Sequence, residues 1–161
     1  MKTALASALG GLVLLAAVPV RATDPAPLPA FEVKTLDGQP VASAGLGPTG
    51  RWLLLYVTPR SHPSELLLRL VKKQEDGDVA TRMVVFVGGS LAETQAVCDA
   101  FPALARATWY ADPDRSAFAA LAVKGVPTAA GLQDRSMEWK LDGVPADTRT
   151  VKSILLSWIA E

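Results

Sequence analysis

The densest apolar run of the chain is Arg51–Val57 (RWLLLYV), which lies between Gly50 and Pro59. It is short for a helix, and it does not alternate between polar and apolar residues. Such a run is typical of a strand buried on both faces, as in a sheet covered by helices. A second run of this kind, Met83–Val87, indicates a neighbouring strand. We therefore expect one central sheet with helices on both sides.

Helical signals alternate with these strands. Ser61 is placed to cap a helix to about Lys73, whose predicted apolar face is Leu66, Leu67, Leu70 and Val71. Ser90 and Glu93 form a capping box for a helix that ends near Pro102. The other expected elements are a hairpin over Phe31–Val41, a loop over 42–50, an extended Ala107–Tyr110, a helix over Asp114–Val123, strands Thr128–Leu132 and Met137–Leu141, and a helix from Asp147. The order predicts an α/β fold with a mixed central sheet, an N-terminal β-hairpin and an antiparallel final strand pair.

Residues 1–22 have the pattern of a secretory signal peptide. Lys2 precedes the uncharged apolar stretch Ala4–Val18, and a cleavage site follows at Ala22. A retained membrane anchor is the alternative, although the stretch is short for a bilayer span. Residues 23–30 (TDPAPLPA) are Pro-rich and predict a linker or extended arm, which leaves residues 31–161 as one domain. We expect a periplasmic protein with no membrane span once the signal is cleaved.

Charge and cysteine content narrow the function classes. The chain has 16 basic and 16 acidic residues, and loss of Lys2 and Arg21 leaves a net charge of −2. This balance argues against a nucleic-acid partner, which favours a basic stripe. Cys98 is the single cysteine, so no intramolecular disulfide can form. We expect Cys98 to be a buried, inert thiol on a helix face shared with Leu91 and Phe101; a reactive thiol is the alternative.

Two segments together resemble the thioredoxin-fold family. Trp52–Leu70 is similar to its active-site segment, in which a buried strand leads into Pro-x-Cys-x-x-Cys and a helix; Pro59–Ser64 falls on that frame. Trp109–Asp114, a helix and then Lys124–Thr128 resemble the stretch that leads to the family's cis-proline loop. The hairpin and the Pro113 region are most similar to the exported TlpA and redoxin branch. The resemblance covers Pro29–Glu161 and implies a three-layer sandwich and a cis Val126–Pro127 bond.

The family's chemistry does not carry over to this sequence. Ser61 and Ser64 stand where the resemblance places the two cysteines, and a serine hydroxyl is far too weak an acid to replace a thiolate. Leu55 stands where the family often has a buried acid, and Arg60 where an aromatic residue is common. The resemblance therefore implies a redox-inactive member.

The sequence offers little support for a serine nucleophile or for a metal site. A nucleophilic Ser61 or Ser64 needs a base, and the single histidine, His62, is adjacent in sequence rather than one helical turn away. His62, Cys98, Met83 and Met137 make a poor ligand set for a metal carrier unless the fold brings them together. We predict no metal, no cofactor and no catalytic residue.

The leading hypothesis is a binding groove. In the family, the residue before the cis-proline offers its backbone to an extended chain, a mode that needs no cysteine. The partner is expected to be an unidentified envelope protein or peptide, bound as by an accessory or assembly factor; the oligomeric state stays open. The alternative is a monothiol redox or peroxide-reducing protein that uses Cys98. The predicted groove residues are Arg60, Ser61, His62, Pro63, Ser64, Gly125, Val126, Pro127 and Thr128.

Overall fold

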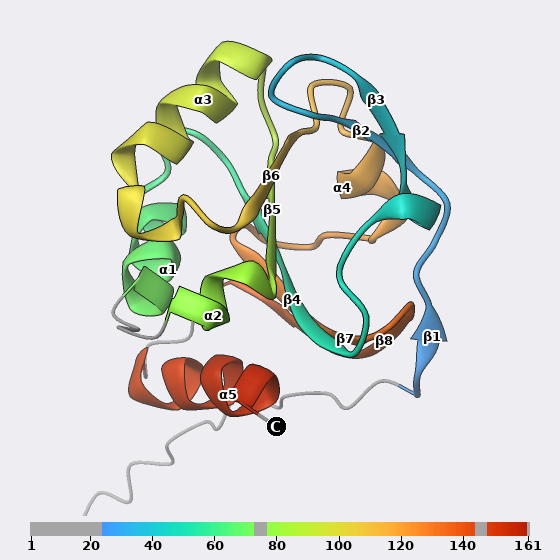
Figure 1. The fold of residues 1–161 in the computed structure, drawn as a ribbon, viewed down its shortest axis with the longest axis vertical. Helices are drawn as coiled ribbons and strands as arrows, with labels where there is room; N and C mark the ends of the chain where they lie inside the picture. The colour runs from blue at the N-terminus through green and yellow to red at the C-terminus, as the bar shows by residue number, and fades with distance from the viewer. Residues whose placement is uncertain (1–23, 73–76, 144–147, 161) are drawn as a thin grey trace, which may run out of the picture.

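The computed structural model describes residues 24–72, 77–143 and 148–160. Its strands are β1 (Ala26–Pro27), β2 (Glu32–Lys34), β3 (Pro40–Ala42), β4 (Arg51–Val57), β5 (Met83–Val87), β6 (Thr108–Ala111), β7 (Thr128–Gln133) and β8 (Ser136–Asp142). They form an eight-stranded sheet in the order β1-β8-β7-β4-β5-β6-β2-β3 (Figure 1). The β4–β5 and β5–β6 pairs are parallel and the other pairs are antiparallel, so the sheet is mixed.

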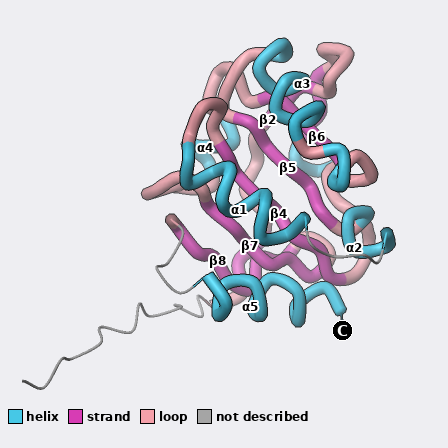
Figure 2. Tube along the Cα trace, turned by 90° about the vertical axis from the view of Figure 1, so that its left-hand side faces the viewer, coloured by secondary structure: helices cyan, strands magenta, loops and turns pink. Residues whose placement is uncertain are grey.

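The helices lie on both sides of this sheet. They are α1 (His62–Lys72), α2 (Gly77–Thr81), α3 (Leu91–Ala100), α4 (Ser116–Ala120) and α5 (Thr148–Ala160). α1, α3 and α5 cover one face, and α4 covers the other (Figures 1 and 2). The predicted mixed sheet, with helices on both faces and an N-terminal β-hairpin, is confirmed.

β4 is buried on both faces, as its composition predicts. Leu53, Leu55 and Val57 pack into the core beneath α1 and α5. Trp52, Leu54 and Tyr56 point to the opposite face and pack into a second core. Because every second side chain of β4 enters a different core, one strand joins the two layers. Burial of each large apolar side chain contributes roughly 1.5–3 kcal/mol.

α4 corrects the helix predicted over Asp114–Val123. It has only five residues, and Arg115 before it has a left-handed backbone with φ of 57°. The capping acid is Asp112 rather than Asp114: Asp112 Oδ1 accepts from Ala117 N at 3.2 Å, and Oδ2 accepts from Phe118 N at 3.0 Å. A helix that began at Asp114 would have to pass through the left-handed residue, which an α-helix does not accommodate.

The apolar face predicted for α1 is also partly wrong. Leu66 is 36% exposed and Leu70 is half-buried, whereas Leu67, Leu68 and Val71 are buried. Ser64 is buried as well, with 2% exposure. The buried stripe is thus rotated towards Ser64 and Leu68, which are one helical turn apart on the same face.

The Pro-rich arm supplies the edge strand β1. Ala26 pairs with Met137 and Pro27 with Ser136, and Leu28 N donates to Arg135 O at 2.8 Å. Leu28 is buried in the core on the α4 side. α2 was not predicted. The signal-peptide assignment, Lys73 and Asp147 lie outside the described residues. No helix within the described ranges has the length and apolar character to span a membrane.

Candidate functional site

The candidate site begins where β4 leads into α1. Ser61 is the N-cap, as predicted: its Oγ accepts from Ser64 N at 3.4 Å, and its carbonyl accepts from Glu65 N at 3.0 Å. His62 and Pro63 follow as exposed residues of the first turn. Arg60 precedes the cap with a left-handed backbone, φ 57°, and its side chain is 87% exposed. Arg60 and His62 therefore face solvent at the start of α1.

Ser64 has a structural role that the sequence did not predict. Its hydroxyl oxygen accepts a hydrogen bond from Thr58 N at 3.1 Å, and its side chain is buried. The Ser64 hydroxyl therefore ties the end of β4 to the first turn of α1. No hydrogen bond joins His62 to Ser61 or Ser64 in the described part of the chain, so neither serine is paired with a base there.

The loop before β7 lies beside this turn. Thr128 is directly opposite Tyr56 in the β4–β7 register, so the chain just before it runs beside the end of β4. The Val126–Pro127 peptide bond is cis, the isomer that the resemblance implies. Gly125 and Val126 are half-exposed, while Pro127 and Thr128 are buried. Val126 and Ser61 therefore lie at the same end of the sheet, where β4 leads into α1, and we call this end the candidate edge.

The backbone of Val126 is unpaired in the described part of the chain. Within the described residues, its N–H and C=O take part in no hydrogen bond. Its neighbours are held: Pro127 O accepts from Gly143 N at 2.7 Å, and Thr128 Oγ1 lies 2.7 Å from Gly125 O. An extended chain that approached this edge would find one unpaired donor and one unpaired acceptor.

An apolar groove lies on the other side of the α1 turn. It has a volume of about 240 Å³ and runs between α1 and α3. Arg60 and Glu93 form an ion pair of 3.8 Å at its rim. Of the predicted groove residues, Arg60 and Ser64 line it, whereas the loop at residues 125–128 does not. Its lining is Thr58, Pro59, Arg60, Ser64, Glu65, Leu68, Glu93, Ala96, Val97, Ala100 and Phe101. The predicted set is therefore split between two surfaces.

Cys98 is only half-buried, whereas full burial was expected. It packs at the margin of the core beneath α1, together with Val97. Thr94 is the fully buried residue of α3, and its Oγ1 donates to Ser90 O at 2.9 Å. Burial, followed by the nearby Asp99 carboxylate, raises the pKa of the Cys98 thiol. A raised pKa disfavours the thiolate that redox chemistry needs.

Tyr56 and Asp112 form a buried polar pair near the end of β4, which the sequence did not predict. The Tyr56 hydroxyl donates to Asp112 Oδ2 at 2.9 Å, and both side chains are almost fully buried. Burial, then the Asp112 carboxylate, raises the pKa of Tyr56 well above its ordinary value. The signal available in the sequence was Asp112 itself, an acid placed directly after the apolar strand residues Tyr110 and Ala111.

Metal chemistry finds no ligand cluster in the ranges that the structure describes. Within those ranges, no three His, Cys, Asp or Glu side chains lie close enough together to hold an ion. His62 is exposed at the start of α1, and Cys98 lies on α3, so the structure does not combine them into a site.

Comparison with known proteins gives a match in fold alone. No family model and no curated protein sequence matches the chain. A Chlorobium tepidum structure assigned as the thiol:disulfide interchange protein DsbE superposes with a TM-score of 0.67 at 16% identity, over 86% of this chain and 99% of that one. Peroxidoxin BcpB from Mycobacterium tuberculosis gives 0.65 at 13%, over 84% and 96%.

An exposed lipoprotein thioredoxin, Etrx1 from Streptococcus pneumoniae, superposes with a TM-score of 0.57 at 14% identity, over 80% of this chain and 98% of that one. By name these three proteins are a thiol:disulfide interchange protein, a peroxidoxin and a thioredoxin. At such low identities the likeness establishes the architecture, and activity has to be argued from the residues of this chain.

Proposed function

We propose that this chain, which has the thioredoxin fold, is a redox-inactive binding module of the bacterial envelope. It binds an extended segment of an envelope protein or peptide at the edge formed by Arg60–His62 and Gly125–Val126. The observation that carries this proposal is the unpaired backbone of Val126, a half-exposed residue at the end of the sheet where α1 begins. A strand laid against such an edge gains main-chain hydrogen bonds without any thiol chemistry.

The chemistry of the two serines supports a binding role over an oxidoreductase role. Ser61 Oγ is engaged as an N-cap, and Ser64 Oγ accepts from Thr58 N. Neither hydroxyl can form a mixed disulfide, and one cysteine cannot supply an intramolecular pair. Export to the envelope is supported by the N-terminal signal pattern and by a fold shared with secreted and exposed redoxins.

Site-directed photocrosslinking tests this proposal. A benzoylphenylalanine placed at His62 should trap a discrete partner in the envelope, because His62 is exposed beside the proposed edge. The same probe at Ser153, exposed on α5, is the matched control. Val126→Pro then removes the backbone N–H that a bound strand would use, whereas Val126→Ala keeps it.

The expected result is a His62 adduct that Val126→Pro abolishes and Val126→Ala retains, with both variants folded by circular dichroism. An equally strong adduct from Ser153 would show that the capture is nonspecific. Survival of the adduct in folded Val126→Pro would reject strand addition at this edge.

The half-exposure of Cys98 leaves a monothiol function as the second candidate. Such a function needs the thiol to reach a peroxide or a disulfide as a thiolate. The raised pKa of Cys98 argues against it, and the side chain lies on α3 rather than at the start of α1, where the fold offers helix-dipole activation. A mature protein that reduces peroxide, and loses this activity in Cys98→Ser, would establish the second candidate.

A further inference from the structure

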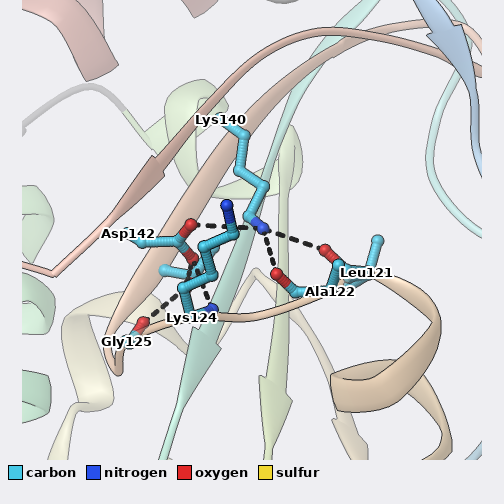
Figure 3. A network of polar contacts seen from close by, with 7 residues as sticks. Leu121, Ala122, Lys124, Gly125, Lys140 and Asp142 are labelled. Carbon is cyan, nitrogen blue, oxygen red and sulfur yellow. Dashed lines mark hydrogen bonds and ion pairs between the residues drawn. The ribbon is translucent and has the colours of Figure 1, made fainter. Parts of the chain in front are cut away.

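Lys140 on β8 is a nearly buried lysine that contacts two carbonyls of the segment before β7 and one carboxylate of its own strand. Its Nζ donates to Leu121 O at 2.9 Å and to Ala122 O at 2.7 Å, and it lies 3.2 Å from Asp142 Oδ2 (Figure 3). The side chain is only 15% exposed. An ammonium group has three N–H donors, and here each has an oxygen partner.

The two carbonyls belong to the residues that follow α4: Leu121 is the C-cap of the helix, and Ala122 is the next residue. A helix leaves its last carbonyls unpaired, and a cation near them is stabilising. Ala122 also has a left-handed backbone with φ of 48°, a conformation that non-glycine residues seldom adopt. Lys140 therefore stabilises a costly turn at the point where the chain leaves α4.

Asp142 holds the other half of the loop. Its Oδ1 accepts from Lys124 N at 3.3 Å and lies 2.7 Å from Thr128 Oγ1, which also lies 2.7 Å from Gly125 O. Lys140 and Asp142 are two apart on one strand, so their side chains share a face of the sheet. From that face they contact the loop before and after Val126.

We infer that Lys140 and Asp142 are the positioning residues of the segment 121–128 and fix where the Val126 backbone is presented. The inference deepens the proposed function and rests on it for its purpose, but the positioning itself is a property of the free protein. Lys140 acts through backbone carbonyls of the loop, and Asp142 acts through the Lys124 amide and the Thr128 hydroxyl.

Amide hydrogen exchange in the purified mature protein, without any partner, tests the positioning. The amides of Ala122, Val123 and Lys124 are hydrogen-bonded and report on this loop. The variants are Lys140→Met and Asp142→Asn. Lys124→Met is the matched control, because it removes an exposed lysine of the same loop and keeps the Lys124 amide bond to Asp142.

Exchange at residues 122–124 should become at least about tenfold faster in Lys140→Met and Asp142→Asn, since hydrogen bonds to charged groups are among the stronger ones. Amides of β4 and β5 should keep wild-type rates, and Lys124→Met should change nothing. Unchanged loop exchange, or an equal acceleration throughout the sheet, would overturn the inference.

A second pair of variants covers the case in which Lys140→Met does not fold. Thr128→Val removes the hydroxyl that joins Asp142 to the loop, and Thr128→Ser restores it. Faster loop exchange in Thr128→Val, with near-normal exchange in Thr128→Ser, would support the network. Equal exchange in the two variants would contradict it. If the loop loosens but the His62 adduct persists, the network does not serve binding. If wild type gives no adduct, the proposed function fails while the positioning result stands.

Discussion

The Ser64 hydroxyl oxygen lies 3.1 Å from the backbone nitrogen of Thr58 and accepts its hydrogen bond. Ser64 occupies the place that the resemblance gives to a redox cysteine, yet here it is buried and serves as the acceptor for the loop between β4 and α1. A thiol is a weak acceptor, so the serine has a local structural advantage at this position.

Ser64→Ala should lower the free energy of unfolding by about 1–2 kcal/mol, because Thr58 N would lose its acceptor in a half-buried loop. Ser64→Cys should fall between alanine and wild type. Urea denaturation at neutral pH measures the change. Ser153→Ala, an exposed serine on α5, is the control and should shift stability by no more than about 0.5 kcal/mol. A neutral Ser64→Ala would contradict the structural role.

The mature protein should not reduce insulin disulfides with dithiothreitol as electron source. Ser61→Cys with Ser64→Cys, in a Cys98→Ser background, should gain weak activity, because the first thiol would stand at a helix N-terminus. We expect that activity to stay low, because Leu55 and Arg60 replace the buried acid and the aromatic residue that the family often has at these positions. Ser61→Cys alone in the same background is the control. Clear turnover by wild type that is lost in Ser61→Ala would refute redox inactivity, and an inert but folded double variant would mean that the site geometry differs from an active one.

Cys98 should react slowly with a thiol reagent at pH 7 and at least about tenfold faster in denaturant. Burial and Asp99 raise its pKa, so the folded protein holds less thiolate than the unfolded chain at the same pH. The native rate should therefore keep rising with pH above the range where an ordinary thiol has already ionised. Stopped-flow labelling measures both rates. Equal native and denatured rates at pH 7 would favour the monothiol candidate.

Stability should fall as the pH rises above about 10, the ordinary pKa of tyrosine. Tyr56 has a raised pKa in the folded state, so the unfolded chain releases this proton first and is favoured at alkaline pH. Tyr56→Phe should flatten the fall, measured by urea unfolding at pH 8 and near pH 11. Tyr110, whose pKa burial also raises, leaves a residual slope. An unchanged slope in folded Tyr56→Phe would remove Tyr56 as its source.

The sequence predicted the elements that depend on local patterns. Seven apolar residues bounded by Gly50 and Pro59 defined β4, and Ser90 with Glu93 defined the start of α3, whose capping box the structure shows. It failed where tertiary contacts decide. Asp112 and Asp114 look equivalent as caps, and only the packing that buries Asp112 beneath Tyr56 selects one. In the sequence, Lys140 and Asp142 look like ordinary exposed charged residues of a strand. Only their contacts with the segment 121–128, which are tertiary contacts, show their role.

The edge strand β1 determines the direction from which the chain enters the fold. Pro27 of β1 pairs with Ser136 of β8, and Ser136 pairs with Gln133 of β7. Gln133 pairs in turn with Arg51, the first residue of β4. The candidate edge comes after Val57, the last residue of β4. The seven extended residues of β4 place Val57 roughly 20 Å from Arg51. The paired residues of the Pro-rich arm therefore close the sheet at the end of β4 that is opposite the Arg60–Val126 edge.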